Sequence, residues 1–190
     1  MYRFGINHFR LSRVGGAIQR RLSPIRYAVA TVSDEHGVRI HVSLPNHVLV
    51  SGETFRADPV GDDLYRLANV PFYAYGLNYR DVVRATPDSE GITTIREVVR
   101  PSGYRTLRVF FDDALDRGQQ DDLLNRVLVP KVVSAERADD LYVSITVSPE
   151  GDYLAVFNLF DAWADEGHLG LETCHAREEG SFDDSPPRRK

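Results

Sequence analysis

"TLRVFFDDALDRGQQDDLLNRVLVP", residues 106–130, contains the change of hydrophobic period that decides the fold. Its first six residues, "TLRVFF", are typical of a strand. From residue 112 onward, apolar residues recur at spacings of three and four, which predicts a helix with Asp112 or Asp113 at its start. Gly118 weakens the middle of this helix, because glycine has a low helix propensity. The stretch therefore predicts a strand followed by a helix.

The sequence after this stretch continues to alternate between strand and helix. "DDLYVSITVS" (139–148) alternates as a strand, "EGD" marks a turn, and "YLAVFNLF" (153–160) is an apolar run that we take as the next strand. "DAWADEGH" (161–168) predicts a short helix and "LGLETCHA" (169–176) a last strand. Residues 104–176 thus carry the order strand, helix, strand, strand, helix, strand, which predicts a ferredoxin-like split βαβ subdomain.

Residues 27–103, on the amino-terminal side, have a β pattern. "RYAVATVS" and "VRIHVSLP" flank the turn sequence "DEHG", "ETFRADPVG" precedes "DLYRLANVPF", and "DVVRATP" and "TTIREVVR" flank "DSEG". Asp and Gly in such positions supply the backbone angles of hairpin turns. Five or six short strands at these spacings predict a small antiparallel β sheet or partly open barrel. The predicted fold class is therefore α+β, with this β-rich subdomain followed by the ferredoxin-like one.

Charge separates the amino-terminal end from the rest of the chain. Residues 1–26 hold six arginines and no acidic residue, whereas residues 27–175 hold 13 basic against 24 acidic residues, a net of −11. We interpret residues 1–26 as a flexible basic extension; an arm that binds nucleic acid or an anionic membrane, and an ordered part of the fold, remain alternatives. Residues 177–190 are polar and contain proline, which predicts a disordered tail.

The composition also bears on location and cofactors. The longest uncharged runs stop well short of the roughly 18 apolar residues that cross a bilayer, and no signal peptide pattern is present. We expect a cytoplasmic protein without a membrane span, and the single cysteine, Cys174, fits a reducing compartment. Cys174 lies near His168 and His175, but without the paired short spacings of a zinc site. We therefore predict neither a metal site nor a cofactor.

The aromatic stretch "NVPFYAYGLNYRDVV", residues 69–83, is the strongest candidate for a binding surface. If it is extended, Phe72 shares one buried face with the residues two positions before and after it, while Tyr73 and Tyr75 share the other face. Tyrosine offers apolar area with little loss of side-chain entropy, so that face suits a base, a small ligand or a partner protein. Packing of the same face against the second subdomain is the alternative. Both interpretations remain open at this point.

Catalytic motifs are absent from the sequence. It contains no GxGxxG after a strand, no GxxxxGK[ST] and no GxSxG, which argues against dinucleotide, nucleoside triphosphate and serine hydrolase sites. Ser102 precedes Gly103, a pair typical of a turn, although a nucleophile is the alternative. An enzyme would need Ser102, Arg105, Asp81 and a histidine to converge in one pocket. We lean towards a protein without catalytic activity, and no catalytic residue is assigned.

Two segments, "LYRLANVPFYAYGLNYRDVVRATPD" and "VVRPSGYRTLRVFF", resemble the bacterial family labelled domain of unknown function 4265. That family has an N-P-F, aromatic, glycine and G-D-V-V pattern followed by a Ser-Gly strand opening, and the resemblance spans about residues 27–175. The matching residues are Asn69, Pro71, Phe72, Tyr75, Gly76, Asp81, Val82, Val83, Ser102, Gly103 and Arg108. Arg80 stands where the family usually has glycine. The resemblance implies a soluble bacterial protein of two small subregions and no particular activity.

The leading hypothesis is a non-enzymatic binding or regulatory module that acts by protein contact. Its acidic body suits an immunity-type protein that neutralises a basic toxin or enzyme. The alternatives are nucleic-acid binding through the arginine-rich arm and the tyrosine face, and an enzyme with an unrecognised site. The candidate ligand- or partner-binding residues are Tyr73, Tyr75, Tyr79, Arg80, Asp81, Ser102 and Arg105. The oligomeric state is not predicted.

Overall fold

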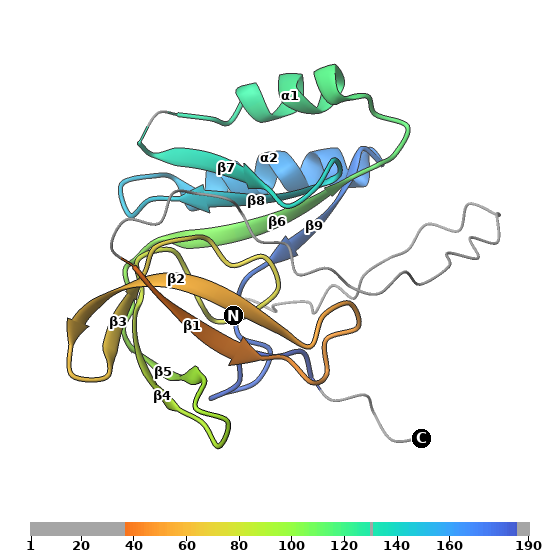
Figure 1. Ribbon diagram of the computed structural model, residues 1–190. Coiled ribbons are helices and arrows are strands. Elements are labelled where there is room, and N and C mark those ends of the chain that lie inside the picture. Colours follow the sequence, from red (N-terminus) through yellow and green to blue (C-terminus); the bar gives the residue numbers. More distant parts are fainter. Residues whose placement is uncertain (1–36, 130, 186–190) are drawn as a thin grey trace, which may run out of the picture.

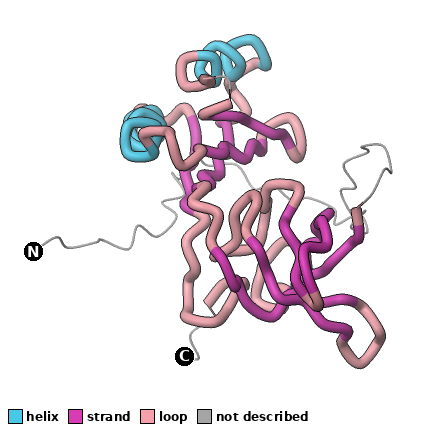
Figure 2. Tube along the Cα trace, turned by 90° about the vertical axis from the view of Figure 1, so that its left-hand side faces the viewer, coloured by secondary structure: helices cyan, strands magenta, loops and turns pink. Residues whose placement is uncertain are grey.

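Two sheets organise the part of the chain that the computed structural model describes, residues 37–129 and 131–185 (Figure 1). The predicted basic extension and the predicted strand "RYAVATVS" lie outside these described residues, as do residues 186–190. The second sheet lies between its own two helices and a β barrel (Figures 1 and 2). This arrangement confirms the α+β class, with β structure first and mixed structure second.

The first sheet is a five-stranded barrel. Its strands are β1 (Val38–Ser43), β2 (Gly52–Gly61), β3 (Leu64–Leu67), β4 (Val82–Pro87) and β5 (Thr93–Arg100). Consecutive strands pair antiparallel, and β1 meets β5 in one parallel position, where His41 lies opposite Thr94. In an antiparallel meander of five strands the first and last run in the same direction, so the closing pair is parallel. The prediction of a small antiparallel β sheet or partly open barrel is confirmed, and the barrel closes through this one parallel β1–β5 pair.

Two of the predicted hairpins are present as expected. The β2–β3 turn at Asp62 and Asp63 takes a positive φ at Asp63, which aspartate tolerates better than most residues. In the β4–β5 turn, the Asp88 carboxylate accepts hydrogen bonds from the amides of Glu90 (2.9 Å) and Ile92 (3.0 Å). Acidic residues and glycine therefore fix these two turns locally, which is why the sequence predicts them well.

The second sheet has the strand order β7-β8-β6-β9, with every neighbouring pair antiparallel. In chain order its elements are β6 (Arg105–Phe111), α1 (Arg117–Asn125), β7 (Val133–Arg137), β8 (Tyr142–Val147), α2 (Tyr153–Asp165) and β9 (Leu169–Thr173). If the four strands of this subdomain are renumbered 1 to 4 in chain order, the sheet read from β9 to β7 has the order 4-1-3-2. This is the predicted split βαβ arrangement. Both helices cover one face of the sheet (Figure 1).

The predicted start of the first helix is wrong by several residues. Helix α1 begins after Asp116, whose carboxylate accepts from the amide of Gln119 while the Gln119 side chain accepts from the amide of Asp116. This capping box satisfies amides that an uncapped helix end leaves free. Asp112 instead closes a turn before the helix, because its backbone carbonyl accepts from the amide of Leu115. Gly118 therefore lies in the first turn of α1, and not in its middle.

The interpretation of residues 153–160 as a strand is also wrong. They form the first two turns of α2, whose buried residues recur at helical spacing: Tyr153, Val156, Phe160 and Trp163. Asp152 caps this helix by accepting from the amide of Ala155 at 3.0 Å. The strand that completes the order is β7, which the sequence pattern does not predict. The order of elements is thus right, although two of its members are differently placed.

Each sheet has its own hydrophobic core. In the second sheet, alternate residues of β6 such as Leu107 and Val109 pack with β8 and the two helices. In the barrel, Phe55, Leu67 and Val83 are fully buried. Because strand residues alternate between faces, the opposite face of β6 carries Thr106 and Arg108 and is turned away from the helices. This polar face of the second sheet is therefore free to meet the barrel.

Two irregular segments fill the space between the sheets. The loop of residues 68–81 joins β3 to β4, so the strand predicted for "DLYRLANVPF" ends at Leu67 and the aromatic stretch after it is not extended. The C-terminal segment, residues 174–185, returns from β9 to the barrel: the Phe182 carbonyl accepts from the amide of Tyr75 (2.8 Å) and the Asp183 carboxylate from that of Asn46 (2.7 Å). Residues 177–185 thus make specific contacts where a disordered tail is predicted.

Candidate functional site

A buried carboxylate sets the shape of the 68–81 loop. Glu53, on β2, accepts hydrogen bonds from the three successive amides of Phe72 (2.7 Å), Tyr73 (3.0 Å) and Ala74 (2.8 Å). Burial raises the pKa of Glu53, although the three amide donors act in the opposite direction. Successive amides that point to one acceptor are incompatible with a strand, in which they alternate in direction. The loop is therefore curved, and the predicted alternation of faces does not apply to it.

Arg108 connects the loop to the second sheet from the other side. It extends from β6, is fully buried, and donates hydrogen bonds to the carbonyl of Ala74 and to Sγ of Cys174 (3.3 Å). Its guanidinium lies 3.4 Å from the carboxylate of Glu172 and 4.7 Å from the ring centre of Tyr75. A guanidinium remains protonated at any physiological pH, so the group provides a permanent buried positive charge.

Tyr73 and Tyr75 lie within this interface. Tyr75 is buried, and its hydroxyl donates to Glu172 at 2.6 Å. Tyr73 is half-buried, with its ring centre 5.8 Å from that of Tyr142 and 5.4 Å from that of His47. Both tyrosines therefore pack inside the chain, against the second sheet, the C-terminal segment and the loop that follows β1.

Asp81 and Ser102 fasten the other end of the loop. The Asp81 carboxylate accepts from the amides of Asn78 (2.8 Å) and Ser102 (2.7 Å), and the Ser102 hydroxyl donates to the carbonyl of Tyr79 (2.7 Å). Ser102 also accepts from the amide of Tyr104 at 3.2 Å. The interpretation of Ser102 as a turn residue thus agrees with its contacts, and its hydroxyl is occupied by the backbone.

Arg105 makes a separate pair of contacts. Its guanidinium stacks 3.7 Å from the ring centre of Tyr153 and lies 2.7 Å from Nε2 of His175. Burial and this neighbouring positive charge lower the pKa of His175. No interaction within the described residues joins Arg105 or His175 to Ser102 or Asp81. The four groups that the enzyme hypothesis needs in one pocket therefore divide into two separate pairs.

Arg80 has an unusual backbone conformation. Its φ is +65°, in the left-handed region that glycine enters without steric strain, and its amide donates to the carbonyl of Leu67 at 3.1 Å. The side chain is exposed, with its guanidinium carbon 5.8 Å from the ring centre of Tyr79. The glycine expected here from the family pattern would take the same conformation. The turn therefore keeps a glycine-like shape although the residue is arginine.

This conformation leads to a stability prediction. Replacing Arg80 by valine is expected to destabilise the fold by about 1–2 kcal/mol, because a β-branched residue strongly resists a positive φ. Replacing it by glycine is expected to change stability by less than about 0.5 kcal/mol, since relief of strain offsets the greater freedom of the unfolded chain. Urea unfolding of the two variants measures the difference, and equal stability of Arg80→Val and Arg80→Gly would contradict the assignment.

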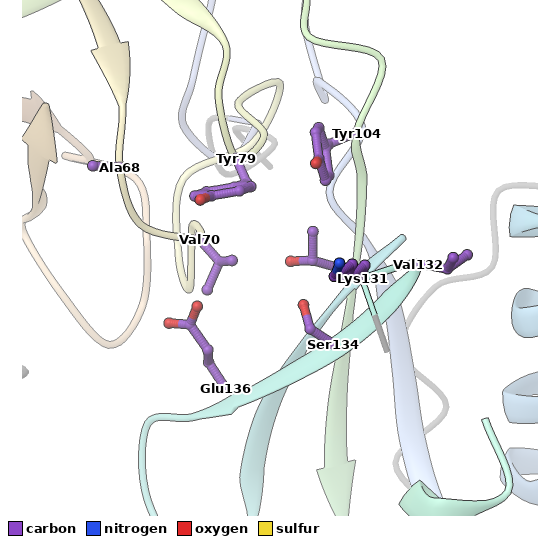
Figure 3. A pocket seen from close by; sticks show the side chains of 9 residues that line it. Ala68, Val70, Tyr79, Tyr104, Lys131, Val132, Ser134 and Glu136 are labelled. Carbon is purple, nitrogen blue, oxygen red and sulfur yellow. The ribbon is translucent and has the colours of Figure 1, made fainter. Parts of the chain in front are cut away.

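A cleft lies where the barrel meets the outer strand β7 (Figure 3). Its volume is about 340 Å³, with Ala68 and Val70 on the barrel side. Its polar lining comprises Tyr79, Tyr104, Lys131, Ser134, Glu136 and Thr146. The rings of Tyr79 and Tyr104 meet edge to face, with centres 5.3 Å apart. In Figure 3 they lie on the side of the cleft opposite Ser134 and Glu136. Tyr79 is thus the one predicted site residue that lines this cleft.

The polar groups of the cleft lack partners in the described part of the chain. Within residues 37–129 and 131–185, no side-chain hydrogen bond or ion pair of the lining residues is present. Among these polar groups, the Thr146 hydroxyl is the one that is both buried and without a hydrogen-bond partner. Thr146 lies opposite Ser134 on β7 and opposite Thr106 on β6, so three hydroxyl residues form a row across the sheet. The Thr146 hydroxyl is therefore able to exchange a hydrogen bond with a group that enters the cleft.

Within residues 37–129 and 131–185, Cys174, His168 and His175 are not arranged as a metal site. Among the described residues there is no group of three or more His, Cys, Asp or Glu side chains arranged to hold a metal ion. Cys174 is buried, and burial raises the pKa of its thiol to about 11. The thiol is therefore protonated at neutral pH and poorly suited to act as a nucleophile.

Within the described ranges, neither helix is both long and apolar enough to cross a bilayer. The longer of the two, α2, has 13 residues, whereas a span needs about 20.

Comparison with known proteins gives the fold and the family. A hypothetical protein from Neisseria gonorrhoeae has a similar structure, with a TM-score of 0.58 and 12% sequence identity over 74% of this chain and 97% of that one. No curated protein matches this sequence. The family profile described as "Domain of unknown function (DUF4265)" matches residues 53–171, which is more than half of the chain. The chain therefore belongs to the DUF4265 family, as the pattern around residues 69–83 and 102–103 indicates.

Proposed function

We propose that this protein is a non-enzymatic binding module of the cytoplasm that acts by contact with a basic protein partner. The contact site is the cleft between the barrel and β7. The observation that carries this proposal is the polar lining of the cleft, including the buried Thr146 hydroxyl, which has no partner in the described residues. An immunity-type role, with a toxin or enzyme as the partner, is one form of the proposal.

The contacts of the reactive side chains support binding in preference to catalysis. Ser102 and Asp81 are hydrogen-bonded to backbone groups, and Cys174 is a buried, protonated thiol. A catalytic group has to reach a substrate, and these groups are directed at the protein itself. The same residues instead hold the 68–81 loop in place, and this loop positions Tyr79 at the cleft.

Charge supports a basic partner. The segment of residues 27–175 carries a net charge of −11, which favours encounter with a positively charged surface. The nucleic-acid alternative has less support, because Tyr73 and Tyr75 are held inside the chain and only Tyr79 reaches the cleft. These three tyrosines therefore do not provide one continuous stacking surface. The arginine-rich arm lies outside the described residues.

Affinity capture from cells of the source organism tests the proposal. The full chain is compared with the double variant Tyr79→Leu/Glu136→Gln and with Glu90→Gln, which alters an exposed carboxylate in the distant β4–β5 turn. We expect the full chain and Glu90→Gln to retain the same basic protein at low salt, with less retained at moderate salt, and the cleft variant to lose it. Recovery of no partner, or equal recovery by the cleft variant, would contradict the proposal.

A further inference from the structure

We infer that the cleft between the barrel and β7 binds a guanidinium group, supplied by an arginine side chain of the partner or by free arginine. If the arginine belongs to a partner protein, the inference rests on the proposed function. If it is free arginine, the inference is independent of that function. Four features of the cleft carry it: a carboxylate without a partner, a pair of hydroxyls beside it, two tyrosine rings across from it, and the acidic charge of the body.

Glu136 supplies the negative charge. It lies on β7, is exposed to solvent, and makes no ion pair or hydrogen bond with any described residue. Partial desolvation at the cleft raises the pKa of Glu136, and no neighbouring positive charge compensates for it. Glu172, whose side chain is only 12% exposed, is by contrast paired with Arg108 and Arg177. A cationic ligand would give Glu136 the partner that it lacks.

The hydroxyls favour a guanidinium over an ammonium group. Ser134 is two residues before Glu136 on β7, so both side chains point to the same face. Thr146 lies directly opposite Ser134 on β8, with its buried Oγ1 unsatisfied. The three residues present several acceptor oxygens on one surface. A planar guanidinium has five N–H donors in a fixed fork, which suits such a spread of acceptors better than a compact ammonium does.

The two tyrosine rings supply a stacking surface. Tyr79 and Tyr104 lie across the cleft from Ser134 and Glu136 (Figure 3). Guanidinium groups are attracted to tyrosine faces. The same chain already uses this contact internally, because Arg105 stacks on Tyr153 at 3.7 Å and Arg177 on Tyr75 at 4.5 Å. A guanidinium between the rings and the carboxylate would reproduce an arrangement that the fold already contains.

Lys131 allows the two sources of arginine to be distinguished. Its exposed side chain lies beside Ser134, at the other end of the cleft from Glu136 (Figure 3). Its positive charge repels a guanidinium alone but attracts the carboxylate of free arginine. Lys131→Gln is therefore expected to weaken the binding of free arginine and to strengthen, or leave unchanged, the binding of an arginine whose carboxylate is blocked.

Titration of the isotope-labelled full chain, followed by NMR shifts of cleft amides, tests the inference. The probe is N-acetyl-arginine amide, with the citrulline and lysine derivatives as neutral and ammonium controls. We expect saturable shifts with the arginine probe, at least about tenfold weaker binding of both controls, and a similar loss in Glu136→Gln. Tyr79→Leu is expected to weaken binding, whereas Glu90→Gln is expected to bind like the unaltered chain.

Contrary outcomes are readily recognised. Absence of saturable shifts with the arginine probe would overturn the inference, as would citrulline binding of equal strength or full binding by Glu136→Gln. An unchanged spectrum outside the cleft shows that each variant is folded. The NMR titration and the affinity capture can fail separately. If capture recovers a partner that requires the cleft but the titration shows no arginine binding, only the inference of a guanidinium ligand is overturned. If the titration shows arginine binding but capture recovers no partner, the proposed contact with a protein is overturned, and free arginine is left as the ligand.

Discussion

Replacing Arg108 by leucine is expected to destabilise the folded chain by about 3–5 kcal/mol. The side chain is fully buried, and it donates to the carbonyl of Ala74 and to the thiol of Cys174 while lying beside Glu172. Leucine fills part of the volume but leaves a buried carbonyl without its donor and a carboxylate without one of its positive neighbours. Removing one member of a buried charged network is costly for this reason. Urea unfolding followed by far-UV circular dichroism measures the loss.

Two further variants isolate the cause of this loss. Arg84→Leu removes an ion pair to Glu97 whose side chains are 45% and 59% exposed, and it is expected to change stability by less than about 1 kcal/mol. Arg108→Lys keeps the charge but loses the planar fork, so it is expected to remain clearly destabilised. A cost for Arg108→Leu no larger than that for Arg84→Leu would contradict the structural role assigned to the buried guanidinium.

Replacing Glu53 by alanine is expected to destabilise the fold by about 3 kcal/mol or more. The change leaves the three amides of residues 72–74 without their acceptor in a buried place, and each such loss costs about 1–3 kcal/mol. The loop would also lose the contact that sets its curvature. Amide hydrogen exchange measures this locally, and the protection of residues 72–74 is expected to fall much further than that of the β4 amides.

Glu53→Gln provides the close control for this prediction. Glutamine keeps the size and one acceptor oxygen, but its NH₂ group faces amide donors and cannot accept from them. We expect a stability between those of the unaltered chain and Glu53→Ala, with partial protection of residues 72–74. Exchange at these three amides that is the same in Glu53→Ala as in the unaltered chain would show that other contacts hold the loop.

The parts of the fold that the sequence predicts are those fixed by local contacts. The β4–β5 hairpin depends on Asp88 and the amides just after it, and strand alternation marks its two sides. By contrast, β7 is only five residues long and becomes a strand through pairing with β8. Residues 153–160 are rich in apolar side chains, so a strand and a buried helix look alike over so short a window. Here the helical spacing of Tyr153, Val156 and Phe160 is the signal that distinguishes them.

The candidate site is less predictable than the fold because distant contacts form it. Tyr79 is a candidate from its aromatic neighbourhood, whereas Glu136 and Thr146 attract no interest in the sequence. They come together through the register of β7 with β8 and through the docking of the barrel. Tyr73 and Tyr75 are placed by Glu53, about twenty residues earlier in the chain, and by Arg108, more than thirty residues later. No local pattern contains that information.

The return of the C-terminal segment to the barrel has a consequence for biosynthesis. Tyr75 and Gly76 donate their amides to the carbonyls of Phe182 and Cys174, residues that a ribosome adds about a hundred residues later. The barrel strands emerge first and can pair during translation, but the loop on which the cleft depends meets these partners only after Phe182 has been added. A nascent chain is therefore expected to acquire its binding site only after the C-terminal segment of residues 174–185 has emerged. Truncation before Cys174 would release barrels that are paired but lack a formed cleft.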